Sequence, residues 1–325
     1  MPAIPVVDLS LLDGTTADRE RLARTVDRAC REVGFFCLTG HGIEPVRLAV
    51  LDALARRFFA LPDEDKAEIA MTRGGRAWRG WFPLGGEITS GRPDQKSGLY
   101  FGAELSADHP RVRAGVPLHG QNLFPSVLPE LREAVLGWMA AMTALGHRVM
   151  RVIASALGLP ETWFERRLTA DPTVLFRIFH YPAGAPAGTW GVGEHTDYGL
   201  LTILAQDDRG GLQVRSRDEW IDVPPDPELF VCNLGDMLDR MTLGRYRSTP
   251  HRVRNTADRD RLSFPFFFDP GWDATVDPIP FPGAPPDDDA DRRWDGTSLR
   301  SLTGTYGDYL LGKVSKVFPD LAAEI

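Results

Sequence analysis

The sequence has little cysteine, no long apolar run and no cluster of basic residues. Three scattered cysteines among 325 residues, Cys30, Cys37 and Cys232, are more consistent with reduced thiols in the cytoplasm than with a disulfide framework. No apolar stretch approaches the length of a membrane span, and the N-terminus lacks a signal-peptide pattern. A net charge of −8 without Lys/Arg runs argues against nucleic acid or a membrane surface as a partner.

What the sequence contains is the composition of an ordinary globular protein. It is 43% hydrophobic and 25% charged, and it is long enough for one large domain or two small ones. Apolar stripes at helical spacing predict helices at 18–33, 45–60 and 129–157, with another from about 301. The helix at 129–157 is the longest, and its regular apolar face predicts that it packs against a sheet. The fold class is therefore mixed α/β.

The segment after Asp171-Pro172 is rich in predicted strands. Gly, Pro and Asp turns separate strand-like runs at 173–181, 200–205, 211–215, 219–223, 229–233, 246–254 and 261–269. Two further short strands are expected at 4–9 and 35–38. Many short strands at this spacing predict a sandwich of two sheets.

Three candidate metal ligands lie within this region. His195 and Asp197 are two residues apart, so on a β-strand their side chains would leave the same face. His251 follows far enough along the chain to lie on a neighbouring strand. Two imidazoles and one carboxylate leave half of an octahedral metal open, which is the facial arrangement of non-haem Fe(II) oxygenases. A structural zinc would instead take four protein ligands.

A second pair of residues has the spacing of a strand face. Arg261 and Ser263 follow soon after His251 and share one face by the same alternation. A guanidinium fork beside a hydroxyl suits a carboxylate. The sequence therefore predicts an anion-binding position close to the metal ligands.

Several short motifs extend this pattern over most of the chain. They are densest from about 174 to 270 and run, in order, 4–9 (IPVVDL), 181–182 (YP), 199–204 (GLLTIL), 211–214 (GLQV), 233–236 (NLGD) and 248–253 (STPHRV). With these motifs the sequence resembles the isopenicillin N synthase-like family of 2-oxoglutarate- and Fe(II)-dependent dioxygenases. The ordered set is far more specific than an isolated His-x-Asp.

The resemblance implies both a fold and a chemistry. The fold would be a double-stranded β-helix, or jelly roll, buttressed by helices. His195, Asp197 and His251 would bind Fe(II), while Arg261, Ser263 and Tyr181 would bind the distal carboxylate of the co-substrate 2-oxoglutarate. With O2, such an enzyme hydroxylates, desaturates or cyclises a small organic molecule and releases succinate and CO2.

Residues that contact the substrate are also suggested. Strand alternation puts Arg177 and Phe179 on the face of Tyr181, and Phe267 on that of Arg261. The segment 72–102 mixes glycines, aromatics and charges without a period, which predicts an irregular loop. It is either a surface loop anchored by its aromatics or, as the resemblance implies, a wall of the substrate pocket with Arg79 and Trp81 on it.

The predicted domain organisation is an N-terminal region at 1–120 that packs on a catalytic core at 121–325. The core would carry the catalytic motifs at 174–270 and end in a C-terminal lid and helix, the whole forming one compact unit. Two alternatives stay open at this point. One is an oxidase that uses the triad without 2-oxoglutarate, as isopenicillin N synthase and the ethylene-forming oxidase of plants do. The other is a metal-binding sensor or scaffold.

Overall fold

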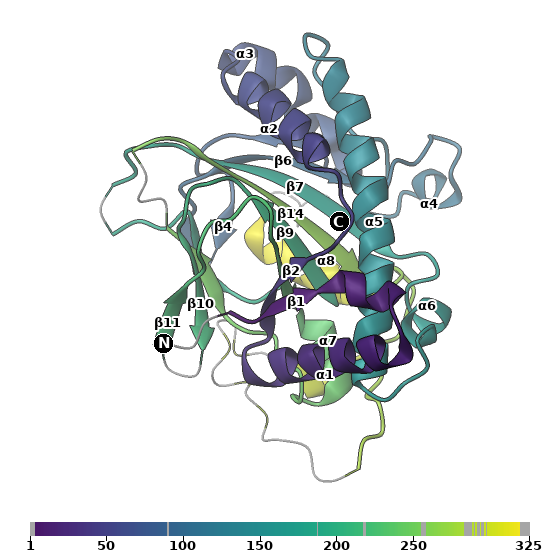
Figure 1. Ribbon diagram of the computed structural model, residues 1–325. Coiled ribbons are helices and arrows are strands. Elements are labelled where there is room, and N and C mark those ends of the chain that lie inside the picture. Colours follow the sequence, from purple (N-terminus) through teal and green to yellow (C-terminus); the bar gives the residue numbers. More distant parts are fainter. Residues whose placement is uncertain are drawn as a thin grey trace.

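The computed structural model describes residues 4–318, apart from 90, 187, 217–218, 255–257, 283–287, 289, 291–292, 294–295 and 297. Helices and strands are mixed, and the strands form large, mostly antiparallel sheets with the helices on their outside (Figure 1). The strands are β1 (Val6–Asp8), β2 (Phe35–Thr39), β3 (Gly80–Phe82), β4 (Ile88–Thr89), β5 (Arg92–Pro93), β6 (Ser97–Gly102), β7 (Thr173–Tyr181), β8 (Val192–His195), β9 (Leu201–Gln206), β10 (Leu212–Ser216), β11 (Glu219–Asp222), β12 (Phe230–Leu234), β13 (His251–Val253) and β14 (Arg261–Asp269).

The larger sheet has eight strands in the order β1-β2-β12-β9-β14-β7-β6-β3, and the smaller has four in the order β11-β10-β13-β8. Strands from before residue 121 therefore lie in the same sheet as strands from the predicted core. At the centre of the large sheet, β14 pairs with β7 so that Arg261 lies opposite Tyr181 and Ser263 opposite Phe179. Because alternate residues share a face, these side chains form one continuous surface.

Most of the predicted strands are confirmed to within a residue or two, but the run at 246–254 is shorter than expected. Only His251–Val253 is a strand. The residues before it bond to loops and a helix instead of a ladder: the backbone N–H of Ser248 donates to Asp239, and the Thr249 hydroxyl donates to the carbonyl of Val33. The next residue, Pro250, has no N–H for a ladder bond.

The predicted long helix is confirmed and forms the main support of the large sheet. The helix α5 packs on β9 and β14, and α1 and α2 pack on α5 (Figure 1, teal). At Gly146 the helix approaches the sheet so closely that a Cβ would lie 2.6 Å from the Phe268 ring. The helices are α1 (Thr16–Glu32), α2 (Pro45–Phe59), α3 (Asp63–Lys66), α4 (Pro110–Arg113), α5 (Glu130–Ala156), α6 (Trp163–Arg167), α7 (Asp236–Thr242) and α8 (Tyr306–Val317).

The prediction of an irregular loop at 72–102 is wrong for much of that segment. It contains β3 and β6, and β6 pairs with β7 so that the segment extends the large sheet. At least one of the glycines in this segment has a packing role in an ordered strand. At Gly98, a Cβ would lie 2.7 Å from the Phe82 ring and 2.8 Å from the Phe179 ring, so only glycine lets these rings close over the strand.

The C-terminal helix α8 begins at a capping box in which Thr305 and Asp308 satisfy each other's backbone N–H groups. Its buried residues include Leu310 and Val314, which face the interior of the protein. The lid expected before this helix falls in part on 283–297, where several residues lie outside the described part of the chain. None of the described helices is both long and apolar enough to cross a membrane.

Two glycines of α5 provide a matched test of this packing. At Gly137, a Cβ would meet only the flexible end of Arg47, at 3.7 Å. Gly137→Ala should therefore raise the free energy of unfolding by about 0.5–1 kcal/mol through helix propensity. At Gly146 the clash with Phe268, about 1–3 kcal/mol, should exceed that gain, so Gly146→Ala should lower stability. Denaturant unfolding followed by circular dichroism measures both, and equal stabilisation by the two variants would contradict the close approach of α5 to β14.

Candidate active site

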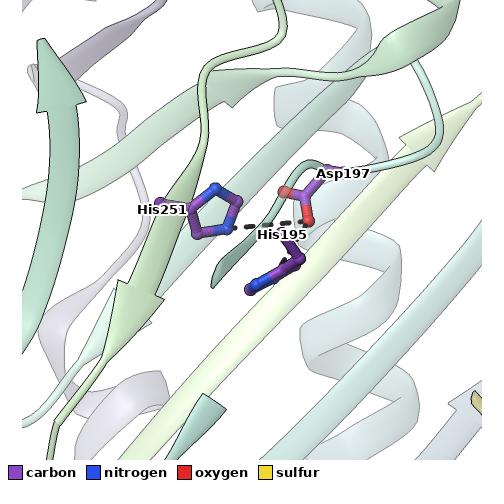
Figure 2. Close-up of side chains that lie close together, drawn as sticks. All are labelled: His195, Asp197 and His251. Carbon is purple, nitrogen blue, oxygen red and sulfur yellow. Dashed lines mark ion pairs between the residues drawn. The ribbon is translucent and has the colours of Figure 1, made fainter. Parts of the chain in front are cut away.

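Three side chains converge where the small sheet meets the loop after β8. His195 ends β8, His251 begins β13 opposite it, and Asp197 follows the strand (Figure 2). One ligand atom from each lies within 4.8 Å of the others. Asp197 Oδ1 is 3.8 Å from His195 Nε2 and 3.7 Å from His251 Nε2. The sequence argument expected Asp197 on the strand itself. The structure corrects this, because β8 has already ended and a loop brings the carboxylate to the two imidazoles.

Backbone carbonyls orient both imidazoles. His195 Nδ1 lies 2.8 Å from the carbonyl oxygen of Gly193, and His251 Nδ1 lies 3.2 Å from that of Thr249. Since a carbonyl oxygen only accepts hydrogen bonds, each Nδ1 donates, and Nε2 is the nitrogen that each ring turns towards the centre of the triad. Burial and the neighbouring His195 also lower the pKa of His251 to about 4, which keeps it neutral at neutral pH.

The carboxylate of Asp197 is held by two donors on its other oxygen. Oδ2 accepts hydrogen bonds from Thr202 Oγ1 at 2.5 Å and Asn233 Nδ2 at 2.6 Å. Burial raises the pKa of Asp197, but His251, His195 and these hydrogen bonds together bring the pKa below its usual range. The group is therefore ionised, with Oδ1 left to face both imidazoles.

The triad opens into a cavity of about 150 Å³ between the two sheets. Strands of the large sheet provide one wall, strands of the small sheet another, and α8 a third, through Leu310, Val314 and Val317. The lining is mostly apolar, with a few charged groups among aromatic rings. This is the usual construction of a binding site for small molecules.

One wall of the cavity carries a guanidinium, that of Arg261, with most of its hydrogen-bond donors unused. Arg261 has no exposed surface, and its Nε and Nη1 atoms have no hydrogen-bond partner among the described residues. Its Nη2 donates only a long bond of 3.4 Å, to Gln206. Ser263 and Tyr181 lie beside it, with their hydroxyl oxygens 3.4 Å apart. A buried cation with free donors beside two hydroxyls fits an anionic ligand that completes the site.

Comparison with known proteins agrees with this geometry. Residues 172–270 match the 2OG-Fe(II) oxygenase superfamily, and residues 4–127 match the N-terminal region described as non-haem dioxygenase in morphine synthesis. The chain belongs to the 2OG-Fe(II) oxygenase superfamily. It is 44% identical over 348 residues to a Dictyostelium discoideum protein named as a probable iron/ascorbate oxidoreductase, covering 98% of this chain and 95% of that protein. It is 35% identical over 336 residues to a homoarginine-6-hydroxylase of Glycine max, with 98% of each chain covered.

A solved structure extends the similarity to the whole fold. A full-length Neurospora crassa protein in complex with alpha-KG and thymine has a TM-score of 0.77 and 27% sequence identity, covering 99% of this chain and 97% of that chain. The superfamily uses Fe(II), 2-oxoglutarate and O2, and the chain is accordingly a 2-oxoglutarate-dependent dioxygenase. The donor set of this oxygenase fits both groups: two imidazoles and a carboxylate suit Fe(II), and the free donors of Arg261 suit a carboxylate.

The other residues singled out from the oxygenase sequence fall into two groups. Arg177, Phe179 and Phe267 line the cavity together with Tyr181. Arg79 and Trp81 are not among the lining residues. Arg79 is buried and donates to the carbonyl of Leu118.

Strand alternation explains the position of Trp81. It lies between Gly80 and Phe82 on β3, where successive side chains face opposite ways. Phe82 packs towards Phe179, with ring centres 6.4 Å apart, while the Trp81 ring lies 5.5 Å from Lys66 Nζ. The face of Phe82 is therefore the one nearer the cavity.

Sequence reasoning missed a buried polar network on the cavity wall of the oxygenase. Lys96 Nζ lies 2.8 Å from Glu87 and 2.5 Å from Asp94, and 4.8 Å from the Phe179 ring centre. Tyr100 donates to Glu87 at 2.7 Å. No sequence signal marked these residues, because their pairing depends on how β6 and the hairpin of β4 and β5 pack together. For Asn233, the NLGD motif was an available signal, although it suggested no role.

Asn233 offers a test of how the triad is held. Asn233→Ala removes one of the two donors that fix Asp197 Oδ2, so Fe(II) affinity should fall about 10–100-fold. Equilibrium dialysis of Fe(II) under nitrogen measures this affinity. Gln213→Ala is the control, because it removes a half-buried side-chain amide of β10 that bonds to Asp222 and Arg252 and to no member of the triad. Equal affinities for all three proteins would show that Asn233 does not position the ligand.

Proposed function

We propose that His195, Asp197 and His251 hold the Fe(II) of this dioxygenase, and that the site oxidises a small organic molecule bound in the adjoining cavity. The observation that carries the assignment is the convergence of two imidazole nitrogens and one ionised carboxylate oxygen on a single point. Three protein ligands leave positions open for exogenous groups, as a facial triad requires.

The reaction needs different contributions from the bound groups and from the protein. Fe(II) with 2-oxoglutarate and O2 supplies the oxidising power for a substrate C–H bond, with release of succinate and CO2. The chain supplies binding and orientation. Thr202 and Asn233 keep Asp197 ionised and in place, and the apolar cavity walls exclude water from the reacting atoms.

We propose that Arg261, Ser263 and Tyr181 bind the distal carboxylate of 2-oxoglutarate. Support comes from the two unpartnered nitrogens of Arg261 and from the adjacent hydroxyls on the same sheet surface. The Arg261 guanidinium also lies over the Tyr181 ring, 4.8 Å from its centre, which restrains its plane.

We also propose that the fold is a jelly roll and that the regions 1–120 and 121–325 act as one compact unit. Two sheets that line one cavity support the first proposal, and the sharing of the eight-stranded sheet by both regions supports the second. A cytoplasmic location is proposed on the chemistry of Cys30, Cys37 and Cys232, which are buried free thiols.

The first test concerns the metal. His195→Ala and His251→Ala should each abolish turnover and weaken Fe(II) binding strongly, because each removes one of three protein ligands. Fe(II) titration under nitrogen and oxygen uptake measure the two effects. His147→Gln is a control, since that ring packs on Phe268 outside the cavity lining. Undiminished iron affinity in either alanine variant would overturn the assignment.

The second test concerns the co-substrate. A buried carboxylate that loses its guanidinium costs about 3–5 kcal/mol, so Arg261→Ala should raise the 2-oxoglutarate KM by two orders of magnitude or more. Arg261→Lys should restore only part of the affinity, because it loses the bidentate fork. Arg166→Ala, at an exposed arginine on α6, is the control.

Succinate formation distinguishes a 2-oxoglutarate-dependent reaction from the two alternatives, an oxidase that does not use 2-oxoglutarate and a metal-binding sensor. Among the relatives, a Dictyostelium mucoroides protein named 1-aminocyclopropane-1-carboxylate oxidase is 34% identical over 357 residues. An unchanged KM for 2-oxoglutarate in Arg261→Ala, together with oxygen uptake that yields no succinate, would favour an oxidase that uses the triad without this co-substrate. Iron binding without oxygen uptake on any substrate would favour a sensor.

A further inference from the structure

A second buried guanidinium lines the cavity and lacks a carboxylate partner. Arg177, in the middle of β7, is 8% exposed. Its Nη1 donates to the carbonyls of Phe101 and Phe176 at 3.0 and 3.1 Å. The guanidinium lies 3.5 Å from the Tyr100 ring centre and 5.9 Å from that of Phe267. Within the described part of the chain, no carboxylate comes within 4.0 Å of its nitrogens.

The carboxylates nearest to Arg177 have other partners. Glu87 is bound by Lys96 and Tyr100. Asp269 accepts hydrogen bonds from the Leu200 backbone and from the Tyr306 hydroxyl. Burial consequently lowers the pKa of Arg177 more than these more distant charges raise it. Buried charges in proteins are ordinarily paired, so an unpaired one on a cavity wall indicates that a ligand supplies the counter-charge.

The strand places this guanidinium apart from the one assigned to 2-oxoglutarate. The cavity-facing residues of β7 are Arg177, Phe179 and Tyr181, and Tyr181 pairs with Arg261. Tyr181 lies four positions beyond Arg177, which corresponds to roughly 13 Å along β7. The cavity thus has a cation at each end of one strand row, with the Phe179 ring between them. One co-substrate carboxylate accounts for only one of these cations.

Aromatic and aliphatic groups make up most of the cavity wall, beside the already paired Glu87 and Asp269. Tyr100 and Phe267 flank the Arg177 guanidinium from the large sheet. Phe179, together with Leu310 and Val314 of α8, lines the same cavity. Tyr100 and Phe179 are 6.2 Å apart between ring centres, so the rings form a continuous aromatic surface beside the guanidinium. Such a surface suits a hydrocarbon or aromatic skeleton.

We propose that Arg177 binds a carboxylate of the organic substrate, whose remaining skeleton is largely apolar and packs against these rings and α8. This rests on the proposed function, because the triad must be the place where that skeleton is oxidised. The substrate class is a small carboxylic acid. Its acid group is anchored away from the 2-oxoglutarate clamp, and a carbon of its skeleton is held towards the triad.

Paired acids and primary amides test the proposal directly, since each pair shares one skeleton and differs in charge. The probes are 3-phenylpropionate, octanoate, indole-3-acetate and leucine, each with its amide. Binding is measured by calorimetry on the full chain with Fe(II) and saturating 2-oxoglutarate under nitrogen, so that Arg261 is already occupied. At least one acid should bind tenfold or more tightly than its amide, about the effect of one charge-assisted hydrogen bond.

Variants of Arg177 separate this role from a purely structural one. Arg177→Gln should reduce the affinity of that acid to the level of its amide, while Arg177→Lys should retain part of the preference. Amide affinity and 2-oxoglutarate affinity should be unchanged in both. The Arg177→Lys variant and unchanged amide binding also report that the fold is intact. Equal binding of acids and amides across the panel, or a preference that survives Arg177→Gln, overturns the proposal.

A wrong Arg177 proposal gives different results from a wrong assignment of the metal or 2-oxoglutarate site. If the triad or the Arg261 clamp were misassigned, His195→Ala and His251→Ala would keep the wild-type affinity for Fe(II), or Arg261→Ala that for 2-oxoglutarate, whatever the acids did. If only the Arg177 proposal were wrong, both would bind normally and the acid preference alone would be missing.

Discussion

The antiparallel pairing of β14 with β7 is the constraint on which the site depends. It sets Arg261 opposite Tyr181 and Ser263 opposite Phe179, so that one sheet surface carries the Arg261 guanidinium at one end and aromatic rings beside it. A register slip of one residue would turn all of these side chains to the other face. The support of this register by α5, through the contact of Gly146 with Phe268, links the packing of the helix layer to the shape of the cavity.

The site contains two kinds of buried charge. Some are paired with groups of the protein, and others have no carboxylate partner. Lys96 is buried, yet Glu87 and Asp94 together satisfy it. Asp197 is buried, and its second oxygen is fully used by Thr202 and Asn233. Arg261 and Arg177 differ from these, because neither has a carboxylate partner within the described residues. These two unpaired cations line the cavity at separate places, and they are the ones for which we propose anionic ligands.

How far the sequence could predict this protein is best seen from particular elements. The strand at 173–181 and the helix at 129–157 follow from long, regular patterns, and both agree with the structure. The segment 72–102 was misjudged, because its glycines relieve ring contacts at Gly98 in an ordered strand. Asp197 was expected on a strand, although a loop presents it. The local sequence pattern does not show whether a glycine is needed for a turn or for a close packing contact. It also does not show at which residue a short strand ends.

By itself the sequence determined which residue types were available as metal ligands and to which family the chain belongs. It also determined the strand alternation that groups Arg177, Phe179 and Tyr181. These points depend only on residue identity and on the geometry of an extended chain. Tertiary structure alone decided that Arg79 and Trp81 lie outside the cavity lining and that Glu87, Lys96 and α8 form its wall. Alternation specifies which residues share a face. Only the pairing of β3 with β6 and of β6 with β7, and the docking of α8, select the face that lines the cavity, because those contacts join residues far apart in the chain.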